Sequence, residues 1–109
     1  MTVEFQLDGQ TFVALNGGPI YKFTEAISFV VPCETQEEID YYWGQLSFDP
    51  KAEQCGWLKD RYGLSWQITP TLLGRMLDSG DQARTARVTR ALLQMKKFDI
   101  AALERVYNG

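Results

Sequence analysis

WLKDRYGLSWQI, residues 57–68, predicts two β-strands joined by a tight turn, and the rest of the chain is arranged around this hairpin. Asp60 can accept hydrogen bonds from the backbone of its own turn. Gly63 can adopt the positive φ that closes a short hairpin loop. Aromatic and aliphatic residues flank the turn on both sides, which is typical of strands that contribute to a hydrophobic core.

The second strand of this hairpin has two different faces. Because side chains alternate along a strand, Leu64, Trp66 and Ile68 share one face, while Ser65 and Gln67 share the other. We expect the first set to pack beneath a helix and the second set to face a cavity or solvent. An aromatic stripe is more often buried area than a ligand platform, so Trp66 is predicted to be a core residue.

Three further strands are predicted before the hairpin. Residues 2–7 alternate between apolar and polar side chains, Asp8-Gly9 supplies a turn, and residues 10–16 form the returning strand. The sequence NGGP, residues 16–19, then interrupts the sheet, because two glycines and a proline do not extend a strand. Residues 25–32 are apolar enough on both faces to predict a strand well inside a sheet.

A helix is predicted over residues 36–46. Thr35 and Glu38 have the spacing of a capping box, in which each side chain satisfies a free backbone N–H of the other residue. Apolar residues then recur at helical spacing and form one stripe that should lie against a sheet. They are Ile39, Tyr42, Trp43 and Leu46.

The carboxy-terminal part is predicted to be helical. Thr69 followed by Pro70 is typical of a helix start, Asp81 is placed to cap a longer helix, and Phe98-Asp99 begins a last short one. The order is therefore β-β-β-α-β-β followed by helices, without internal repeats or low-complexity linkers. This order predicts a single α+β domain.

Composition limits the classes of partner. A formal net charge of −3 and eleven scattered basic residues oppose binding to nucleic acid. No apolar run reaches the roughly 20 residues that cross a bilayer, and the first residues do not resemble a secretory leader. Two cysteines, Cys33 and Cys55, can remain reduced in a chain of this size. We therefore expect a soluble cytoplasmic protein without membrane contact.

Three stretches of the sequence resemble a known family. They are EAISFVVPCETQEEID at 25–40, CGWLKDRYGLSWQ at 55–67 and LLQMKKFDIAAL at 92–103. They are similar to the PhnB-like branch of the vicinal oxygen chelate superfamily, often labelled 3-demethylubiquinone-9 3-methyltransferase domain. Glyoxalase I, bleomycin-resistance proteins and extradiol dioxygenases belong to that superfamily. No glycine-rich stretch here is typical of a site for S-adenosylmethionine.

The resemblance implies a fold made of βαβββ modules. Residues 24–69 would form one complete module, residues 1–19 the last strands of a first module, and residues 70–109 a helical tail. The mixed sheet would then form half of a cup around a ligand. The opening strand and helix of the first module are not in this sequence, so we expect an amino-terminally shortened domain. An unpaired sheet edge favours association, and we predict a homodimer, with or without exchange of a segment.

The same resemblance suggests where a site would lie. Metal-dependent members of the superfamily use His, Glu and Gln ligands, and this chain has no histidine. Aligned on the hairpin turn, Gln67 falls at the last-strand glutamate, and Glu25 lies near the start of a ligand-bearing strand. A neutral amide is a poor ligand for zinc or nickel, so no metal is expected; if one is present, Glu25 and Gln67 would hold it.

The residues proposed to line the cavity are Gln67, Glu25, Trp57, Cys55 and Ser65. Cys55 is expected in a strand that also carries Trp57 and Lys59 on the same face. No histidine is available to activate its thiol, so a nucleophilic role is not favoured. No residue can be assigned a catalytic role from the sequence.

Three functions remain open at this point. The favoured one is a metal-free protein that binds a small molecule without a predicted cofactor. The alternatives are a metal-dependent lyase or dioxygenase of the same superfamily, and an inactive remnant that acts as an interaction or dimerisation module. The sequence decides neither the ligand nor whether the protein is an enzyme.

Overall fold

A computed structural model describes all residues of the chain, 1–109. The elements, in order, are β1 (Thr2–Leu7), β2 (Gln10–Leu15), β3 (Ser28–Cys33), α1 (Gln36–Leu46), a short 3-10 helix (Pro50–Ala52), β4 (Trp57–Lys59), β5 (Ser65–Pro70), α2 (Thr71–Leu77), α3 (Gln82–Leu92) and α4 (Ile100–Asn108). The predicted α+β class is confirmed, with four α-helices and two separate sheets.

The main sheet is small, mixed and open. Its strand order is β3-β5-β4, with β3 parallel to β5 and β4 antiparallel to β5. An isolated antiparallel bridge between Gln54 and Trp57 closes the turn that precedes β4. Both outer strands of this sheet, β3 and β4, therefore have a free edge.

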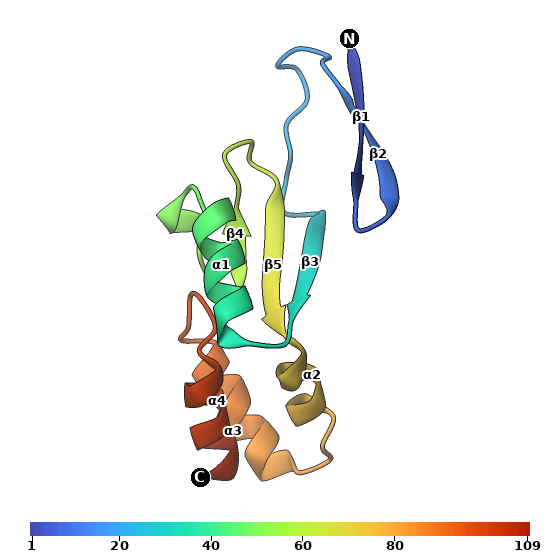
Figure 1. Ribbon diagram of the computed structural model, residues 1–109. Coiled ribbons are helices and arrows are strands. Elements are labelled where there is room, and N and C mark those ends of the chain that lie inside the picture. Colours follow the sequence, from blue (N-terminus) through green and yellow to red (C-terminus); the bar gives the residue numbers. More distant parts are fainter.

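Helix α1 lies against one face of this sheet, and α2, α3 and α4 gather beyond the carboxyl end of β5 (Figure 1). The core forms where these layers meet. It contains nine buried apolar residues, among them Ile39 of α1, Leu58 of β4 and Ile68 of β5. Trp66 is partly buried against the same cluster, as its place in the apolar stripe predicts.

The α1 helix begins and ends as predicted. Thr35 accepts a hydrogen bond from the Glu38 backbone N–H, and the Glu38 carboxylate accepts one from the Thr35 backbone N–H. Ile39 is fully buried, while Tyr42, Trp43 and Leu46 are partly buried around it. The capping box therefore sets the start of the helix, and the apolar stripe sets the face that it buries.

The β1–β2 hairpin forms a second sheet that stands beside β3 without joining it (Figure 1). Asp8 and Gly9 both have positive φ, 51° and 78°, as a two-residue turn of the I′ type requires. The Phe12 ring lies 5.6 Å from the Phe29 ring of β3, and Phe29 contacts Trp66 at 5.3 Å. This aromatic row connects the hairpin to the main sheet.

Backbone hydrogen bonds attach the helical tail to the sheet. The N–H groups of Cys55 and Gly56 each donate to the loop between α3 and α4, at the carbonyls of Met95 and Lys96 (both 2.8 Å). The Gln36 amide adds two more bonds, to the Phe98 carbonyl and from the Ile100 N–H. Because buried backbone groups need partners, these bonds fix the tail in one position.

Three local predictions are wrong. The strand expected from residue 25 begins at Ser28, because Ser28 is the first residue that pairs with β5. Thr69 does not cap a helix: β5 continues through Pro70, and α2 begins at Thr71 without a side-chain cap. Cys55 lies in a turn with φ 50°, outside any strand.

None of the helices is both long and apolar enough to cross a membrane.

Candidate functional site

The face of the main sheet opposite α1 carries the candidate site. The β4 residues Trp57 and Lys59 pair with Gln67 and Ser65 of β5, so these four side chains share one face of the sheet. Leu58, Trp66 and Ile68 lie on the opposite face, toward α1. On the other side of β5, Ser28 and Val30 pair with Ser65 and Gln67. This face is mostly polar, and no helix covers it (Figure 1).

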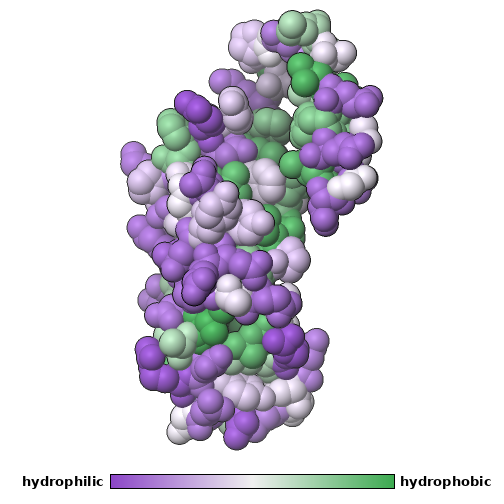
Figure 2. Space-filling view, viewed as in Figure 1, coloured by the Kyte–Doolittle hydropathy of each residue, from purple (hydrophilic) through white to green (hydrophobic).

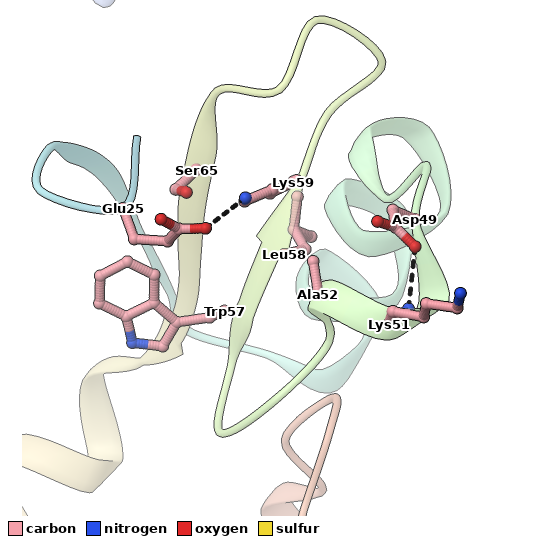
Figure 3. A pocket seen from close by; sticks show the side chains of 8 residues that line it. All are labelled: Glu25, Asp49, Lys51, Ala52, Trp57, Leu58, Lys59 and Ser65. Atoms are coloured by element: carbon pink, nitrogen blue, oxygen red, sulfur yellow. Dashed lines mark hydrogen bonds and ion pairs between the residues drawn. The ribbon is translucent and has the colours of Figure 1, made fainter. Parts of the chain in front are cut away.

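A pocket of about 220 Å³ lies at the β4 end of this face (Figure 3). It is lined by residues from β4, β5, the 3-10 helix and the loop before β3: Glu25, Asp49, Lys51, Ala52, Trp57, Leu58, Lys59 and Ser65. This volume is below the roughly 300–1,000 Å³ of pockets that hold drug-sized ligands. The pocket therefore suits a small metabolite.

An ion pair joins two elements across the pocket. The Lys59 ammonium on β4 contacts the Glu25 carboxylate of the preceding loop (Figure 3). The hydrogen bond from Lys59 is the largest cause that holds the pKa of Glu25 below its usual range, followed by a bond to the Glu25 backbone. Glu25 is thus ionised at neutral pH and is the partner of the one ammonium group that β4 carries.

Ser65 differs from the other polar residues of the pocket. Only 1% of the residue is exposed, and its hydroxyl has no hydrogen-bond partner. A buried hydroxyl without a partner costs about 1–3 kcal/mol, so proteins seldom retain one without a reason. Ser65 lines the pocket, but its hydroxyl oxygen is buried, so a molecule in the pocket would reach it only when a neighbouring side chain moves aside.

The other sequence-predicted site residues are placed differently. Gln67 lies on the open face, but its amide donates to the Ser28 hydroxyl (2.9 Å), and it does not line the pocket. Cys55 was expected beside Trp57, but the turn removes it from the pocket, and its sulfur accepts a long contact from Gln54 (3.5 Å). Glu25, Trp57 and Ser65 are brought together.

The donors present do not fit a divalent metal. Among all 109 residues there is no group of three or more His, Cys, Asp or Glu side chains that could hold an ion. Glu25 is engaged by a cation, and Gln67 offers a neutral amide that is already bonded to Ser28. A metal site needs several deprotonated or neutral nitrogen, oxygen or sulfur ligands that converge on one point.

The two thiols are separate and differ in exposure. Cys33 is fully buried, and this desolvation is the main cause that raises the pKa of its thiol, with Glu38 adding a smaller effect. Cys55 is partly exposed, and the two cysteines form no disulfide. A thiol with a raised pKa is a poor nucleophile at neutral pH, so Cys33 belongs to the core.

Lys59, Asp49 and Lys51 line the pocket but were not among the predicted site residues. A signal for Lys59 was available, because alternation places it on the same face as Trp57. Asp49 and Lys51 carried no comparable signal. They reach the pocket through the 3-10 helix, where the Asp49 carboxylate accepts a hydrogen bond from the Lys51 N–H (3.0 Å).

A mixed open sheet, with one helix on one face and a polar pocket on the other, defines an α+β domain with an open sheet. The chain belongs to the family described as 3-demethylubiquinone-9 3-methyltransferase, whose sequence pattern matches residues 1–69. The helical tail lies outside this match. No curated protein sequence is significantly similar to the chain.

A solved structure supports the same assignment. The PhnB protein from Bacillus cereus, which carries the same family description, is 35% identical to this chain and superposes with a TM-score of 0.53. The match covers 65% of this chain and 64% of the Bacillus cereus protein. The present chain therefore corresponds to about two thirds of that relative.

Proposed function

We propose that this protein binds a small molecule in the pocket on the open face of the main sheet, without a metal ion or other cofactor. The unpartnered, buried Ser65 hydroxyl carries the proposal, because it is an unused hydrogen-bonding group at a pocket of metabolite size. Membership of a PhnB-like family with a glyoxalase fold supports a binding role. The unsuitable donor set gives no support to the metal-dependent lyase or dioxygenase.

Trp57→Ala should weaken ligand binding about threefold to tenfold, because an aromatic contact is worth about 0.5–1.5 kcal/mol. The experiment is an NMR screen of small polar and aromatic fragments, followed through the Trp57 indole and Gln67 amide signals. At least one fragment should shift these signals saturably. Tyr62→Ala is the control, because this exposed aromatic residue lies outside the pocket and its loss should leave binding unchanged.

If no fragment shifts the Trp57 signal, the proposed function is wrong and a role as an interaction module gains support. A fragment that binds Trp57→Ala as tightly as the unaltered chain would place the site elsewhere.

We also propose that the protein is a homodimer. Its exposed area is 7821 Å², whereas a compact monomer of this mass exposes roughly 6,100 Å². The excess exceeds the roughly 800 Å² that each partner buries in a standard interface. The radius of gyration, 16.2 Å, is also larger than the about 13 Å expected for this length. The chain thus has ample surface for a second copy to cover.

The uncovered surface is apolar along the amino-terminal part. Figure 2 shows apolar side chains in the hollow between the β1–β2 hairpin and the main sheet. Both faces of the hairpin carry exposed apolar residues: Val3, Phe5 and Leu7 share the face of Phe12 toward the main sheet, and Val13 and Leu15 lie on the opposite face. The loop after the hairpin adds Ile20, Tyr21 and Ile27. β3 also has a free edge, so a strand of a second copy can pair with it.

The two cysteines bear on the cellular compartment. Cys33 and Cys55 are both free thiols, which is compatible with a location in the cytoplasm.

Light scattering at micromolar concentration should give twice the chain mass of 12.4 kDa. Leu15→Lys should raise the dissociation constant of the dimer about tenfold or more, because burying a leucine is worth about 1.5–3 kcal/mol. The control is Ala86→Lys, which adds the same charge on the exposed surface of α3. This variant should remain a dimer with an unchanged dissociation constant. A folded monomer for the unaltered chain would contradict the proposal.

A further inference from the structure

We propose that the pocket binds a small monocarboxylate at Lys59 and Ser65, and that Glu25 is an internal competitor that holds the same position when no ligand is bound. This inference rests on the proposed function, since it concerns the same pocket. It adds the chemical class of the ligand and a residue that sets the affinity.

Lys59 and Ser65 together form a two-donor arrangement. They are direct partners in the β4–β5 pairing and point to the same face of the sheet. The Lys59 ammonium and the Ser65 hydroxyl can each donate to one oxygen of the same acceptor. A carboxylate has two such oxygens, and hydrogen bonds to an ionised acceptor are the stronger kind.

The only acceptor that the chain itself supplies to Lys59 is the carboxylate of Glu25. Glu25 forms an ion pair with Lys59 but no hydrogen bond with the Ser65 hydroxyl, which has no partner. A carboxylate of similar chemistry that contacted both donors would satisfy a group that the present arrangement leaves unsatisfied. The ligand would therefore form one more hydrogen bond in this position than Glu25 does.

Glu25 is also easy to displace. It lies in the loop before β3, and 65% of its side chain is exposed, compared with 29% for Lys59. Exposed ion pairs contribute little to stability because water solvates both partners well. Figure 3 shows Glu25, Trp57 and Ser65 on one side of Lys59, and Asp49 and Lys51 on the other. Glu25 can therefore move into solvent while the sheet remains in place.

The remaining lining describes the rest of the ligand. Trp57 shares the face of Lys59 and offers an aromatic surface, and Ala52 adds an apolar contact. Asp49 and Lys51 also line the pocket with opposite charges, so together they add no net attraction for a second carboxylate on the ligand. The volume of about 220 Å³ limits the apolar part to a small group. These features fit a compact, apolar or aromatic acid with a single negative charge.

The test compares phenylacetate with its neutral isostere phenylacetamide in NMR titrations that follow the Trp57 indole signal. Phenylacetate should bind more tightly than phenylacetamide. Glu25→Gln should tighten phenylacetate binding about two- to fivefold, the factor that corresponds to an exposed ion pair, and leave phenylacetamide unchanged. Lys59→Met should remove the preference for the acid.

Ser65→Ala is the second variant. It removes a hydroxyl that has no partner within the protein, so the fold should keep its stability, while phenylacetate should bind severalfold more weakly. Equal binding of acid and amide would overturn the carboxylate inference and leave the pocket as a binding site. Weaker phenylacetate binding in Glu25→Gln would also overturn it. Absence of any Trp57 shift with either probe would overturn the inference too, whereas the proposed function is contradicted only if the fragment screen also gives no shift.

Discussion

Gly56→Ala should destabilise the protein by about 2–4 kcal/mol, because the substitution combines an unfavourable backbone conformation with a steric clash. Gly56 has φ +81°, a conformation that residues with a Cβ rarely adopt. An added Cβ would lie 2.4 Å from Cε2 of Phe98 and 3.1 Å from the backbone oxygen of Ile68. Phe98 is a core residue that is 3% exposed, so its ring has little room to move.

The position is also where the helical tail meets the sheet. The Gly56 N–H donates to the Lys96 carbonyl, and the Gly56 carbonyl accepts from the Ile68 N–H (both 2.8 Å). A displacement at residue 56 would strain both hydrogen bonds together. The loss of stability should therefore appear in the helical tail and in β5 alike.

Urea denaturation monitored by circular dichroism measures the change in the free energy of unfolding, with Gly63→Ala as the matched control. Gly63 has almost the same φ, +86°, but nothing lies within 4 Å of an added Cβ. It should lose only the backbone contribution of about 1–2 kcal/mol. Phe98→Leu should partly relieve Gly56→Ala in a double-mutant cycle. Equal losses for the two glycines would show that Phe98 adapts freely and that the packing argument is wrong.

Asp60→Ala should destabilise the protein by about 2–3 kcal/mol, since hydrogen bonds to charged groups contribute about 1.5–3 kcal/mol and three such bonds share one carboxylate. One oxygen accepts from the backbone N–H groups of Tyr62 (2.9 Å) and Leu64 (3.0 Å). The other accepts from the indole N–H of Trp66 (2.9 Å). The residue thus holds both the turn and the tryptophan that packs against the core.

Asp60→Asn separates these two roles. The amide oxygen can still accept from the turn backbone, while the amide nitrogen cannot accept from the indole. This variant should lose less stability than Asp60→Ala, and Trp66→Phe should abolish the difference between aspartate and asparagine. Denaturation curves and the chemical shift of the Trp66 indole proton provide the two measurements. A loss below about 0.5 kcal/mol for Asp60→Ala would contradict the prediction, because that is the usual effect of an ordinary surface substitution.

Local chemistry explains which parts of the fold were predictable. The Asp8-Gly9 turn, the capping box at Thr35 and the Asp60 turn each depend on residues only a few positions apart. Such signals are written in the sequence because they need no distant partner. The prediction that Ser65 and Gln67 share one face of β5 was possible for the same reason, because side chains alternate along a strand.

The predictions that differ from the structure concern residues whose positions depend on contacts with distant parts of the chain. Glu25 was expected at the start of a strand, but β3 begins only where β5 begins, at the pairing of Ser28 with Ser65. Cys55 was expected beside Trp57, but its N–H bonds to the Met95 carbonyl forty residues away, and the chain turns there. Neither partner is identifiable from the local pattern.

By itself, the sequence determined the α+β class, the family, the helix over residues 36–46 and the polar character of the sheet face that bears Ser65. These follow from short-range hydrogen bonding and from hydrophobic periodicity. Only the tertiary structure decided that Glu25 meets Lys59, that the Ser65 hydroxyl has no partner, and that Cys55 leaves the pocket. Those facts depend on the relative positions of the loop before β3, the strands β4 and β5, and the loop between α3 and α4. Long-range packing sets these positions.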